Sequence, residues 1–258
     1  MDPDDVAGFF DSEAARYDAA YDEAGPEGYA LRSRLAAVLR LLGAGPGDVL
    51  DAGMGPGRLC TELDRRGWTV SGVDSSKQMV AFARTRLPHA RDRLLPARLE
   101  SLPFADASFD AVVATGVLEY LDDCAAGLAE LGRVLRPGGT AVVSVPNAHG
   151  IYSLWCRHIV YPASRAVKRH VDFGRRVPPR RGRVRSRPRL EAMLGGTGLH
   201  VVAVEYVSLF VLLTPLDRLF PRTTVWVAQR FEGRGSQTGK LLATQLVVAA
   251  RKEAASLS

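Results

Sequence analysis

Glycines at three alternate positions mark the stretch of the chain best suited to hold a ligand. The apolar segment Val49-Leu50-Asp51 leads into Gly53, Gly55 and Gly57, and residues 58–66 then have helical character. A strand, glycine turn and helix of this kind lets a ligand approach the backbone, because glycine has no Cβ. The helix beyond the turn offers unpaired N–H groups to an acceptor atom. The pattern predicts either a ligand site or an ordinary glycine-rich turn.

A second acid, Asp74, narrows the choice of ligand. It ends the next predicted strand, about 20 residues beyond the turn, where a carboxylate accepts the hydroxyls of a ribose. The glycine spacing does not match the dinucleotide fingerprint, because Arg58 interrupts it, and no Gly-Lys-Ser/Thr of a P-loop follows. An acid at this position also disfavours a phosphate on the ribose. The glycine turn and Asp74 together predict a nucleoside-containing ligand.

Five segments in the same order resemble the motifs of class I S-adenosylmethionine-dependent methyltransferases. Residues 10–18 are also similar to the helix that covers the cofactor in this family, and the resemblance extends over about residues 9–147 and the last two strands. It implies a small-molecule enzyme, similar to the ubiquinone and secondary-metabolite methyltransferases, with S-adenosyl-L-methionine as cofactor. The five segments are Asp51-Ala52-Gly53-Met54-Gly55-Pro56-Gly57, Val73-Asp74-Ser75-Ser76-Lys77-Gln78-Met79, residues 100–110, Val117-Leu118-Glu119-Tyr120-Leu121 and residues 131–139.

The resemblance implies a role for individual residues of these motifs. Asp51 orders the glycine turn, and Asp74 binds the ribose hydroxyls. Met79 is an apolar cover for the adenine, and Tyr17 closes over the cofactor. The complete set of cofactor-binding residues implied by the resemblance is Tyr17, Asp51, Gly53, Met54, Gly55, Asp74, Ser75, Met79, Leu99, Glu100, Thr115 and Val117.

The chain departs from the family pattern at two places. Many relatives have an Asp-Ala pair before the position of Glu100, and that acid holds the adenine amine, but this chain has Arg98-Leu99. Because arginine cannot accept a hydrogen bond, we expect the adenine to be recognised by backbone groups, Glu100 or shape. The ubiquinone-pathway O-methyltransferases carry two acids and a histidine for a metal where this chain has Gly116, Glu119 and Tyr120. No metal is therefore expected.

Side chains that could remove a proton from an acceptor follow the fourth and fifth predicted strands. Ligands bind at this edge of open α/β sheets. The predicted catalytic residues are His149, Glu119 and Tyr120, and His149 is preferred because it directly follows Pro146-Asn147. An oxygen nucleophile usually needs a base, whereas an amine needs only to be bound neutral, and positioning contributes much of the catalysis in either case. We expect O-methylation, with N-methylation as the alternative.

The positive charge of the chain is confined to one segment. Residues 157–189 hold 12 basic residues and one acid, whereas the rest has 22 basic and 27 acidic residues. Four interpretations remain open: a solvated loop, recognition of an anionic acceptor, attachment to anionic lipid beside the apolar residues 209–220, and binding of single-stranded nucleic acid. Nucleic acid is the weakest, because no RNA-binding module is attached. The apolar residues 209–220 are expected to form a helix that walls the acceptor pocket or contacts a second copy in a homodimer.

Composition and cysteine spacing bear on where the protein works. The chain has 258 residues, of which 47% are hydrophobic, which suits one domain with an ordinary core. Its three cysteines form no close pair, and no apolar stretch follows the acidic N-terminus. The longest apolar run is too short for a membrane span. We expect a cytoplasmic protein.

Strands that alternate with helices predict an α/β fold in a single methyltransferase domain over residues 1–258. We expect a Rossmann-like, seven-stranded, mostly parallel sheet with an antiparallel last strand and helices on both faces. Residues 1–45 form lid helices, and residues 147–189 and 207–239 form acceptor-binding insertions, the first as a loop and the second with helices over 209–220 and 225–231. The expected strands are 49–51, 68–73, 94–97, 109–114, 140–145, 199–206 and 241–250.

The composition also bears on the pathway, by analogy alone. High Arg, Ala and Gly contents are typical of high-GC bacteria, in which such enzymes often serve secondary-metabolite or antibiotic biosynthesis. Two alternatives stay open. One is a binding module that keeps the fold without catalysis, and the other is an RNA-modifying enzyme that uses the Arg-rich segment.

Overall fold

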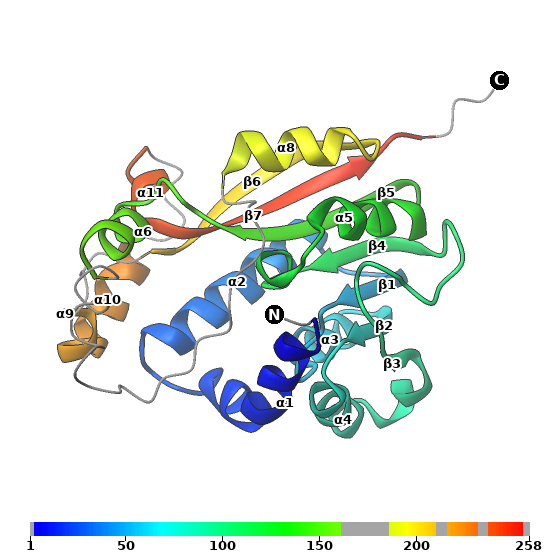
Figure 1. Cartoon of the computed structure of the whole chain (residues 1–258), viewed down its shortest axis with the longest axis horizontal. Coiled ribbons are helices and arrows are strands. Elements are labelled where there is room, and N and C mark those ends of the chain that lie inside the picture. The colour runs from blue at the N-terminus through cyan, green and yellow to red at the C-terminus, as the bar shows by residue number, and fades with distance from the viewer. Residues whose placement is uncertain (1–2, 161–185, 210–215, 232–236, 255–258) are drawn as a thin grey trace.

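The computed structural model of the protein describes residues 3–160, 186–209, 216–231 and 237–254. Predictions for the other residues, including 161–185 of the basic segment, lie outside the described residues. One twisted sheet runs through the molecule and helices cover both of its faces (Figure 1). None of the helices in the described ranges is long and apolar enough to cross a membrane.

The sheet has seven strands in the order β3-β2-β1-β4-β5-β7-β6. Strand β7 pairs antiparallel with β5 and with β6, and all other neighbouring pairs are parallel. This arrangement confirms the predicted Rossmann-like sheet with an antiparallel last strand. The strands are β1 (Gly47–Ala52), β2 (Trp68–Asp74), β3 (Leu94–Pro96), β4 (Phe109–Ala114), β5 (Leu135–Pro146), β6 (Leu199–Leu209) and β7 (Ala243–Lys252).

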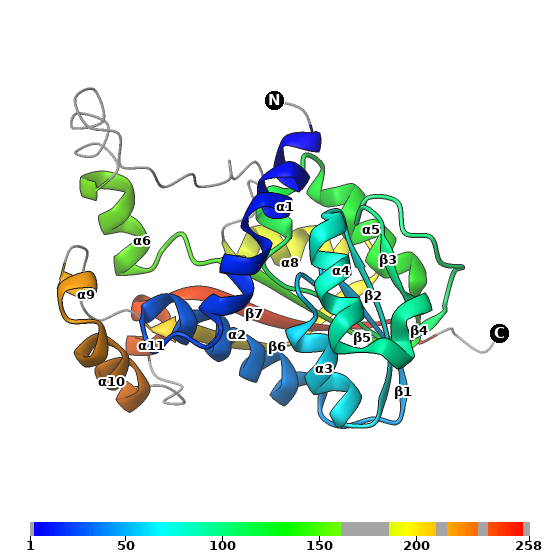
Figure 2. The same cartoon turned by 90° about the horizontal axis from the view of Figure 1, so that it is seen from below.

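The helices fall into three groups by position (Figures 1 and 2). One face of the sheet is covered by α2 (Pro26–Leu42), α3 (Arg58–Arg65) and α4 (Lys77–Arg86), and the other by α5 (Cys124–Val134) and α8 (Arg187–Gly195). Helix α1 (Pro3–Ala20) lies outside these layers, against α4. Short helices gather at one end of the molecule, namely α6 (Ile151–Trp155), the π-helix η3 (Cys156–Val160), α9 (Leu216–Leu219), α10 (Pro221–Phe231) and α11 (Gln237–Leu242).

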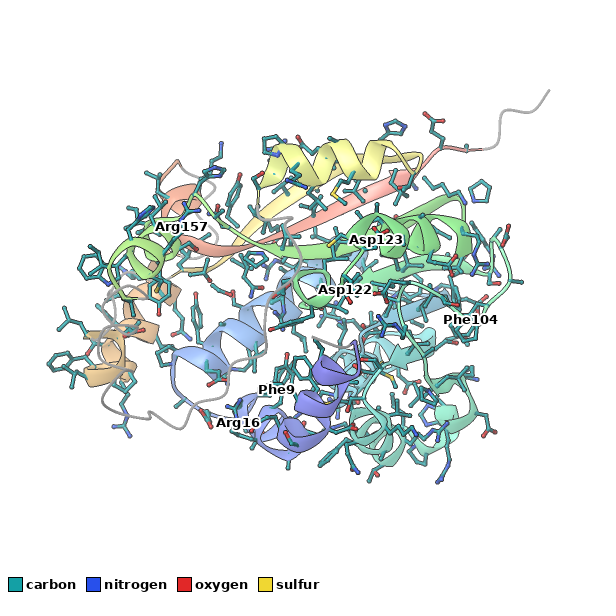
Figure 3. All side chains as sticks on the ribbon, in the orientation of Figure 1. Phe9, Arg16, Phe104, Asp122, Asp123 and Arg157 are labelled. Atoms are coloured by element: carbon teal, nitrogen blue, oxygen red, sulfur yellow. The ribbon has the colours of Figure 1, made fainter. Side chains whose placement is uncertain are left out.

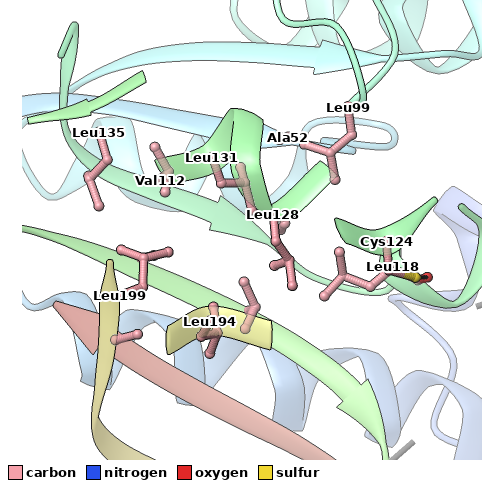
Figure 4. Packing of buried hydrophobic residues seen from close by; sticks show 14 of the residues in the cluster. Ala52, Leu99, Val112, Leu118, Cys124, Leu128, Leu131, Leu135, Leu194 and Leu199 are labelled. Atoms are coloured by element: carbon pink, nitrogen blue, oxygen red, sulfur yellow. Dashed lines mark hydrogen bonds between the residues drawn. The ribbon is translucent and has the colours of Figure 1, made fainter. Parts of the chain in front are cut away.

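Two hydrophobic cores hold the central strands in place. Leu50 and Val112 face the core that contains Leu128 of α5 and Leu194 of α8, shown in Figure 4. Val49, the neighbour of Leu50, faces the opposite core, under α2 to α4. Because both faces of a parallel sheet are buried, its strands consist of nearly continuous apolar residues. The two cores fix the carboxyl end of β1, where the glycine turn begins, and the carboxyl end of β4 beside it.

Three predicted elements differ from the structure at the end occupied by the short helices. The helix predicted over 209–220 is wrong at its start, because Leu209 pairs with Ala243 and ends β6. Residues 147–189 were predicted as a loop, but α6 and η3 lie within them. Leu241 and Leu242 were predicted as strand and instead end α11. Apolar runs of this length do not by themselves distinguish strand from helix, so pairing partners far away in the sequence decide.

Candidate active site

A cavity of about 810 Å³, including its open mouth, lies at the carboxyl ends of β1, β2 and β4. Helix α1 contributes one wall, and the loops that follow β3 and β4 contribute the opposite one. Ligands bind at this edge in open α/β sheets, because the loops there are free of strand pairing. Its lining residues are Val6, Phe10, Tyr17, Gly53, Gly55, Asp74, Ser75, Met79, Ala97, Arg98, Leu99, Glu100, Thr115, Gly116, Val117, Tyr120, Leu121 and Asp122.

The cavity brings together most residues that the sequence predicted. Of the cofactor-binding set, Asp51 and Met54 are outside the lining and the other ten residues are within it. Of the predicted catalytic residues, Tyr120 lines the cavity, while Glu119 and His149 do not. The predicted site residues did not include Val6, Phe10, Ala97, Arg98, Gly116, Leu121 and Asp122.

Some of the missed residues left a trace in the sequence. Val6 and Phe10 are four positions apart on α1 and continue the helix face that carries Tyr17, so helical spacing could have found them. Asp122 follows directly after the motif at 117–121, and its exposed side chain lies near the middle of the view in Figure 3. Ala97 and Gly116 have no distinctive side chain, so only the tertiary structure identifies them.

Asp74 joins the end of β2 to the glycine turn. Its Oδ2 accepts a hydrogen bond from the Gly55 N–H and its Oδ1 accepts one from the Ser76 N–H, each at 2.9 Å. Burial raises the pKa of Asp74 to about 6, against these two backbone hydrogen bonds, which lower it. Each carboxylate oxygen accepts more than one hydrogen bond. Asp74 is therefore held in a fixed orientation with acceptor capacity left for a diol in the cavity.

Asp51 and Met54 are buried on the core side of the glycine turn. Asp51 is buried and accepts a hydrogen bond from the Cys60 Sγ at 3.4 Å. The pKa of Asp51 is raised to about 7, mainly by burial and also by the nearby charge of Asp74, against the hydrogen bond from Cys60, which lowers it. Met54 is also buried, and its sulfur occupies the space beside Gly72, where an added Cβ would lie 2.4 Å from it. Neither side chain lines the cavity, and the role of Asp51 in ordering the turn stays a prediction.

The glycines of the turn allow close packing that no other residue would permit. Gly53 has φ +83°, and an added Cβ would lie 2.9 Å from the Cβ of Val117. Gly57 has φ +79°, and its added Cβ would lie 2.9 Å from both Cα and Cβ of Ala83. Positive φ angles favour glycine. The turn is thus pressed between α4 and the loop after β4, which forms a narrow cradle for a ligand that lies along the backbone.

Helix α1 is fastened to the sheet domain by polar contacts. Asp11 accepts hydrogen bonds from the Ser76 hydroxyl at 2.6 Å and from the Gln78 N–H at 3.0 Å, at the start of α4. Further along the helix, Asp18 pairs with Arg58 at 2.8 Å and with Arg86. These contacts place the face of α1 that carries Phe10 and Tyr17 over the cavity.

Aromatic rings connect α1 to the far wall of the cavity. Phe10 meets Tyr120 with ring centroids 5.3 Å apart and an interplanar angle of 79°. The same Phe10 meets Tyr17 edge to face at 6.2 Å. Edge-to-face contacts of this kind stabilise aromatic pairs. The three rings bridge helix α1 and the loop that follows β4.

Arg34 of α2 lies directly behind the cavity and was not predicted. It is 7% exposed, and its guanidinium donates to the Gln245 Oε1 at 3.2 Å and the Tyr17 hydroxyl at 3.3 Å. An added Cβ at Gly116, which lines the cavity, would lie 2.8 Å from the Arg34 Nη1. Its hydrogen-bond partners within the described part of the chain are neutral. One clue existed in the sequence, because Arg34 interrupts the apolar face that Leu31 and Val38 form on α2.

Glu119 and His149 lie in contrasting environments. Glu119 is 3% exposed, and its Oε2 has no hydrogen-bond partner among the described residues. Its charge helps to raise the pKa of Arg34, together with Tyr17 and Tyr21 and against the effect of burial. His149 stands exposed in the turn after β5, where its N–H donates to the Asn147 Oδ1 at 3.2 Å. The described residues contain no group of three His, Cys, Asp or Glu side chains arranged to hold a metal ion.

Comparison with known proteins assigns the chain to a family. Residues 50–143 match the family model described as a methyltransferase domain. The demethylmenaquinone methyltransferase of Beutenbergia cavernae is 37% identical over 173 residues, which are 64% of this chain and 70% of that protein. The malonyl-[acyl-carrier protein] O-methyltransferase of Erwinia billingiae is 36% identical over 106 residues, 41% of each chain. The chain belongs to the class I S-adenosylmethionine-dependent methyltransferases.

A solved structure shares the fold of this chain. It is the 1,6-didemethyltoxoflavin N1-methyltransferase of Burkholderia thailandensis, in complex with 1,6-didemethyltoxoflavin and S-adenosylhomocysteine. The two chains are 21% identical with a TM-score of 0.60, and the match covers 98% of this chain and 91% of that one. The cofactor of this protein is S-adenosyl-L-methionine, and the narrow glycine cradle beside the fixed carboxylate of Asp74 suits its extended, nucleoside-containing shape.

Proposed function

We propose that the protein methylates a hydroxyl oxygen of a small-molecule acceptor, bound beside the cofactor in the cavity under α1. The observation that carries the proposal is the cavity between the glycine turn and Tyr120. When bound, S-adenosyl-L-methionine supplies an activated methyl group, so much of the remaining task is to orient the acceptor and exclude water. The rings of Phe10, Tyr17 and Tyr120 perform both tasks in this proposal.

We propose that the ten lining residues of the predicted set contact the cofactor and that Asp74 accepts the ribose hydroxyls. Gly53 and Gly55 allow the methionyl part to lie along the backbone, next to Thr115 and Val117. Asp51 and Met54 act indirectly in this proposal, because they support the turn from the core side.

We assign Arg34 to the carboxylate of the methionyl group. Its guanidinium is buried beside Gly116, and its hydrogen-bond partners in the described chain are a phenol and an amide. Glu119 acts on Arg34 through its charge, but no hydrogen bond joins the two side chains among the described residues. A carboxylate is the group that best matches a guanidinium, and a ligand carboxylate at this point of the cavity would supply an anionic hydrogen-bond partner.

We propose that Tyr120, rather than His149, is the polar side chain that contacts the acceptor. Tyr120 faces the cavity, whereas His149 is exposed in a turn outside its lining. Glu119 remains a candidate for drawing a proton from the site, because it is buried beside Tyr120 with an unpartnered oxygen. An oxygen acceptor needs such a route for its proton. N-methylation stays the alternative, since an amine bound in its neutral form needs no base.

A labelled-methyl assay tests the proposal. The enzyme is incubated with the donor carrying a ¹³C methyl group and, in parallel, with a phenol, an aromatic amine and a short-chain demethylmenaquinone analogue. The carbon chemical shift of the product distinguishes a methyl group on oxygen, nitrogen or carbon. Methylation of the phenol alone supports the proposal, and transfer to nitrogen or carbon alone overturns it.

Two variants test the acceptor-side residues in the same assay. Tyr120→Phe should lower turnover at least about tenfold, as expected when a positioned polar group is lost. His149→Ala should leave turnover unchanged, and the reverse result would restore His149 as the base.

We further propose that the protein is cytoplasmic and serves secondary metabolism. Its cysteines Cys60, Cys124 and Cys156 are all free thiols, which is typical of a reducing compartment such as the cytoplasm.

A further inference from the structure

The large apolar side chains on the surface are concentrated at one end of the molecule. Among the described residues, nine large apolar side chains are exposed, and eight of them lie on or beside the short helices α6, η3, α9, α10 and α11. The eight are Ile151, Leu154, Ile159, Leu216, Leu219, Phe220, Trp226 and Leu241. We call residues 151–160, 216–231 and 237–242 the end cap. Exposed apolar side chains that are concentrated in one region mark an interaction site more often than scattered ones do.

The end cap is one packed unit and not a set of separate helices. The Tyr152 hydroxyl of α6 donates to the Asp217 Oδ2 of α9 at 3.0 Å. Helix α10 packs against α2 and β6, and α11 contacts α6. Figures 1 and 2 both place these helices together, at the end away from β3 and α4. The exposed apolar side chains therefore share a common support.

Helix α10 shows most clearly how the end cap divides into an inner and an outer face. Thr224 and Ala228, four positions apart, are buried, and Ala228 packs with Tyr29. Trp226 lies between them in sequence and is 67% exposed. Arg222 and Arg230 are four positions before and after Trp226, so all three side chains project from the same outer face. A tryptophan between two arginines suits the boundary between water and lipid.

The charged side chains described on the surface of the end cap are all basic. They are Arg157, Arg222, Arg230 and Lys240, and Arg157 lies at the end-cap side in Figure 3. Asp217 is the one acid among the described residues of the end cap, and it is buried against Tyr152. A surface that exposes both apolar side chains and cations is complementary to a bilayer that carries anionic headgroups, since basic residues near such a surface are attracted to it.

The end cap is adjacent to the active site. It follows the carboxyl end of β5 and spans the connection from β6 to β7, whereas the cavity lies at the carboxyl ends of β1, β2 and β4 in the same sheet. We propose that the end cap binds the surface of an anionic lipid bilayer. This binding places the mouth of the acceptor site near the membrane, where an apolar acceptor would be concentrated. The placement of the acceptor site near the membrane rests on the proposed function, but the binding of the end cap to the bilayer does not.

Vesicle sedimentation tests the proposal with the full chain and without cofactor or acceptor. The protein is mixed with vesicles of phosphatidylcholine alone, or with vesicles of which about one third is phosphatidylglycerol. We expect co-sedimentation with the anionic vesicles, at least about tenfold weaker binding to the neutral ones, and weakening with salt. Equal binding to both vesicle types, or no binding to either, would overturn the proposal.

Matched variants separate the end cap from the remaining surface. Trp226→Ser should weaken binding about fivefold, and Val202→Ser, which changes the one exposed large apolar residue described outside the end cap, should not. Arg222→Glu/Arg230→Glu should weaken binding at least about tenfold, whereas Arg91→Glu/Arg251→Glu, with the same change of net charge elsewhere, should have little effect. End-cap variants that bind like their controls would overturn the proposal, even if the wild type binds.

Sedimentation velocity without lipid tests the competing occupant, a second copy of the chain. A monomer at the concentrations of the vesicle experiment supports the lipid proposal. A dimer that dissociates in Trp226→Ser would assign the apolar surface to self-association and overturn it. Because neither measurement uses methyl transfer, failure of the lipid proposal is distinguishable from failure of the proposed reaction.

Discussion

The cofactor end of the site and the end cap differ in whether their side chains find partners within the chain. Around the glycine turn, each Asp74 oxygen accepts a backbone N–H, Asp11 and Asp18 of α1 have partners on α3 and α4, and Gly57 is pressed against Ala83. In the end cap, large apolar side chains and arginines face solvent. The first region is prepared for one ligand shared by the whole family. The second has surface left over for a partner outside the chain.

The comparison predicts that the glycine turn tolerates no added side chain. Gly57→Ala should lower the free energy of unfolding by about 3 kcal/mol, because overpacking against Ala83 adds to the strain of a positive φ. Gly67→Ala is the matched control, since Gly67 has φ +85° but open space around its Cβ position, and it should cost about 1 kcal/mol. Chemical denaturation of both variants measures the difference. Equal losses would show that packing at the turn is loose.

Removal of the Asp74 carboxylate should have the next largest effect. Asp74→Ala leaves the Gly55 and Ser76 N–H groups without their acceptor and removes the proposed ribose contact, so S-adenosylhomocysteine should bind about fiftyfold more weakly. Calorimetry measures the affinity, with the exposed Asp92→Ala as control. Unchanged affinity in Asp74→Ala would contradict the proposed role.

A variant of Arg34 gives a sharper test, because its affinity can be compared between a ligand that has a carboxylate and a ligand that lacks one. Arg34→Gln should weaken S-adenosylhomocysteine about thirtyfold, the value of a lost charge-assisted contact. It should leave the affinity for 5′-methylthioadenosine, which has no carboxylate, nearly unchanged. Equal losses for both ligands would mean that Arg34 holds Tyr17 and Gln245 in place and does not bind the carboxylate.

Cofactor affinity should also rise with pH. The pKa of Asp74 is raised to about 6 by burial, and the ionised form is the better acceptor for ribose hydroxyls. The affinity for S-adenosylhomocysteine should therefore increase about tenfold from pH 5 to pH 7. Asp74→Asn should abolish this increase, and an increase that persists in the variant would assign the titration to another group.

The same carboxyl groups should act in the opposite direction on stability. The pKa values of Asp74, about 6, and Asp51, about 7, both lie above the ordinary 3.8. The folded state therefore binds more protons than the unfolded state from the ordinary pKa of 3.8 up to the raised pKa of each group. The contribution of the two groups to the free energy of unfolding falls as the pH rises through this window. Denaturation of the ligand-free protein at a series of pH values, compared with Asp74→Asn, measures it.

The smallest effect is expected on the exposed face of the end cap. Trp226→Ser should change the free energy of unfolding by less than about 0.5 kcal/mol, because the indole is largely in solvent. Leu128→Ala, at a fully buried site, should cost about 3 kcal/mol and serves as the contrast. A large loss in Trp226→Ser would indicate that the indole packs within the chain.

The sequence alone determined the sheet and most of the cavity. Buried parallel strands consist of apolar runs bounded by turns, and the glycines at 53, 55 and 57 with Asp74 follow from local backbone needs that are visible in the residue types. The antiparallel last strand and the cofactor came from the resemblance of several motifs in order. Ten of the predicted cofactor residues meet in one cavity for this reason.

The tertiary structure alone decided the rest. Leu209 is a strand residue because Ala243, far along the chain, pairs with it, and an apolar run does not contain that information. Arg34 reaches the site from α2, and Gln245 meets it from β7, so no local pattern connects them. His149 follows the right strand, yet its turn carries the side chain into solvent, while Tyr120 faces the cavity. Sequence spacing fixes which strand end a residue follows, but packing of distant elements sets the direction in which it points.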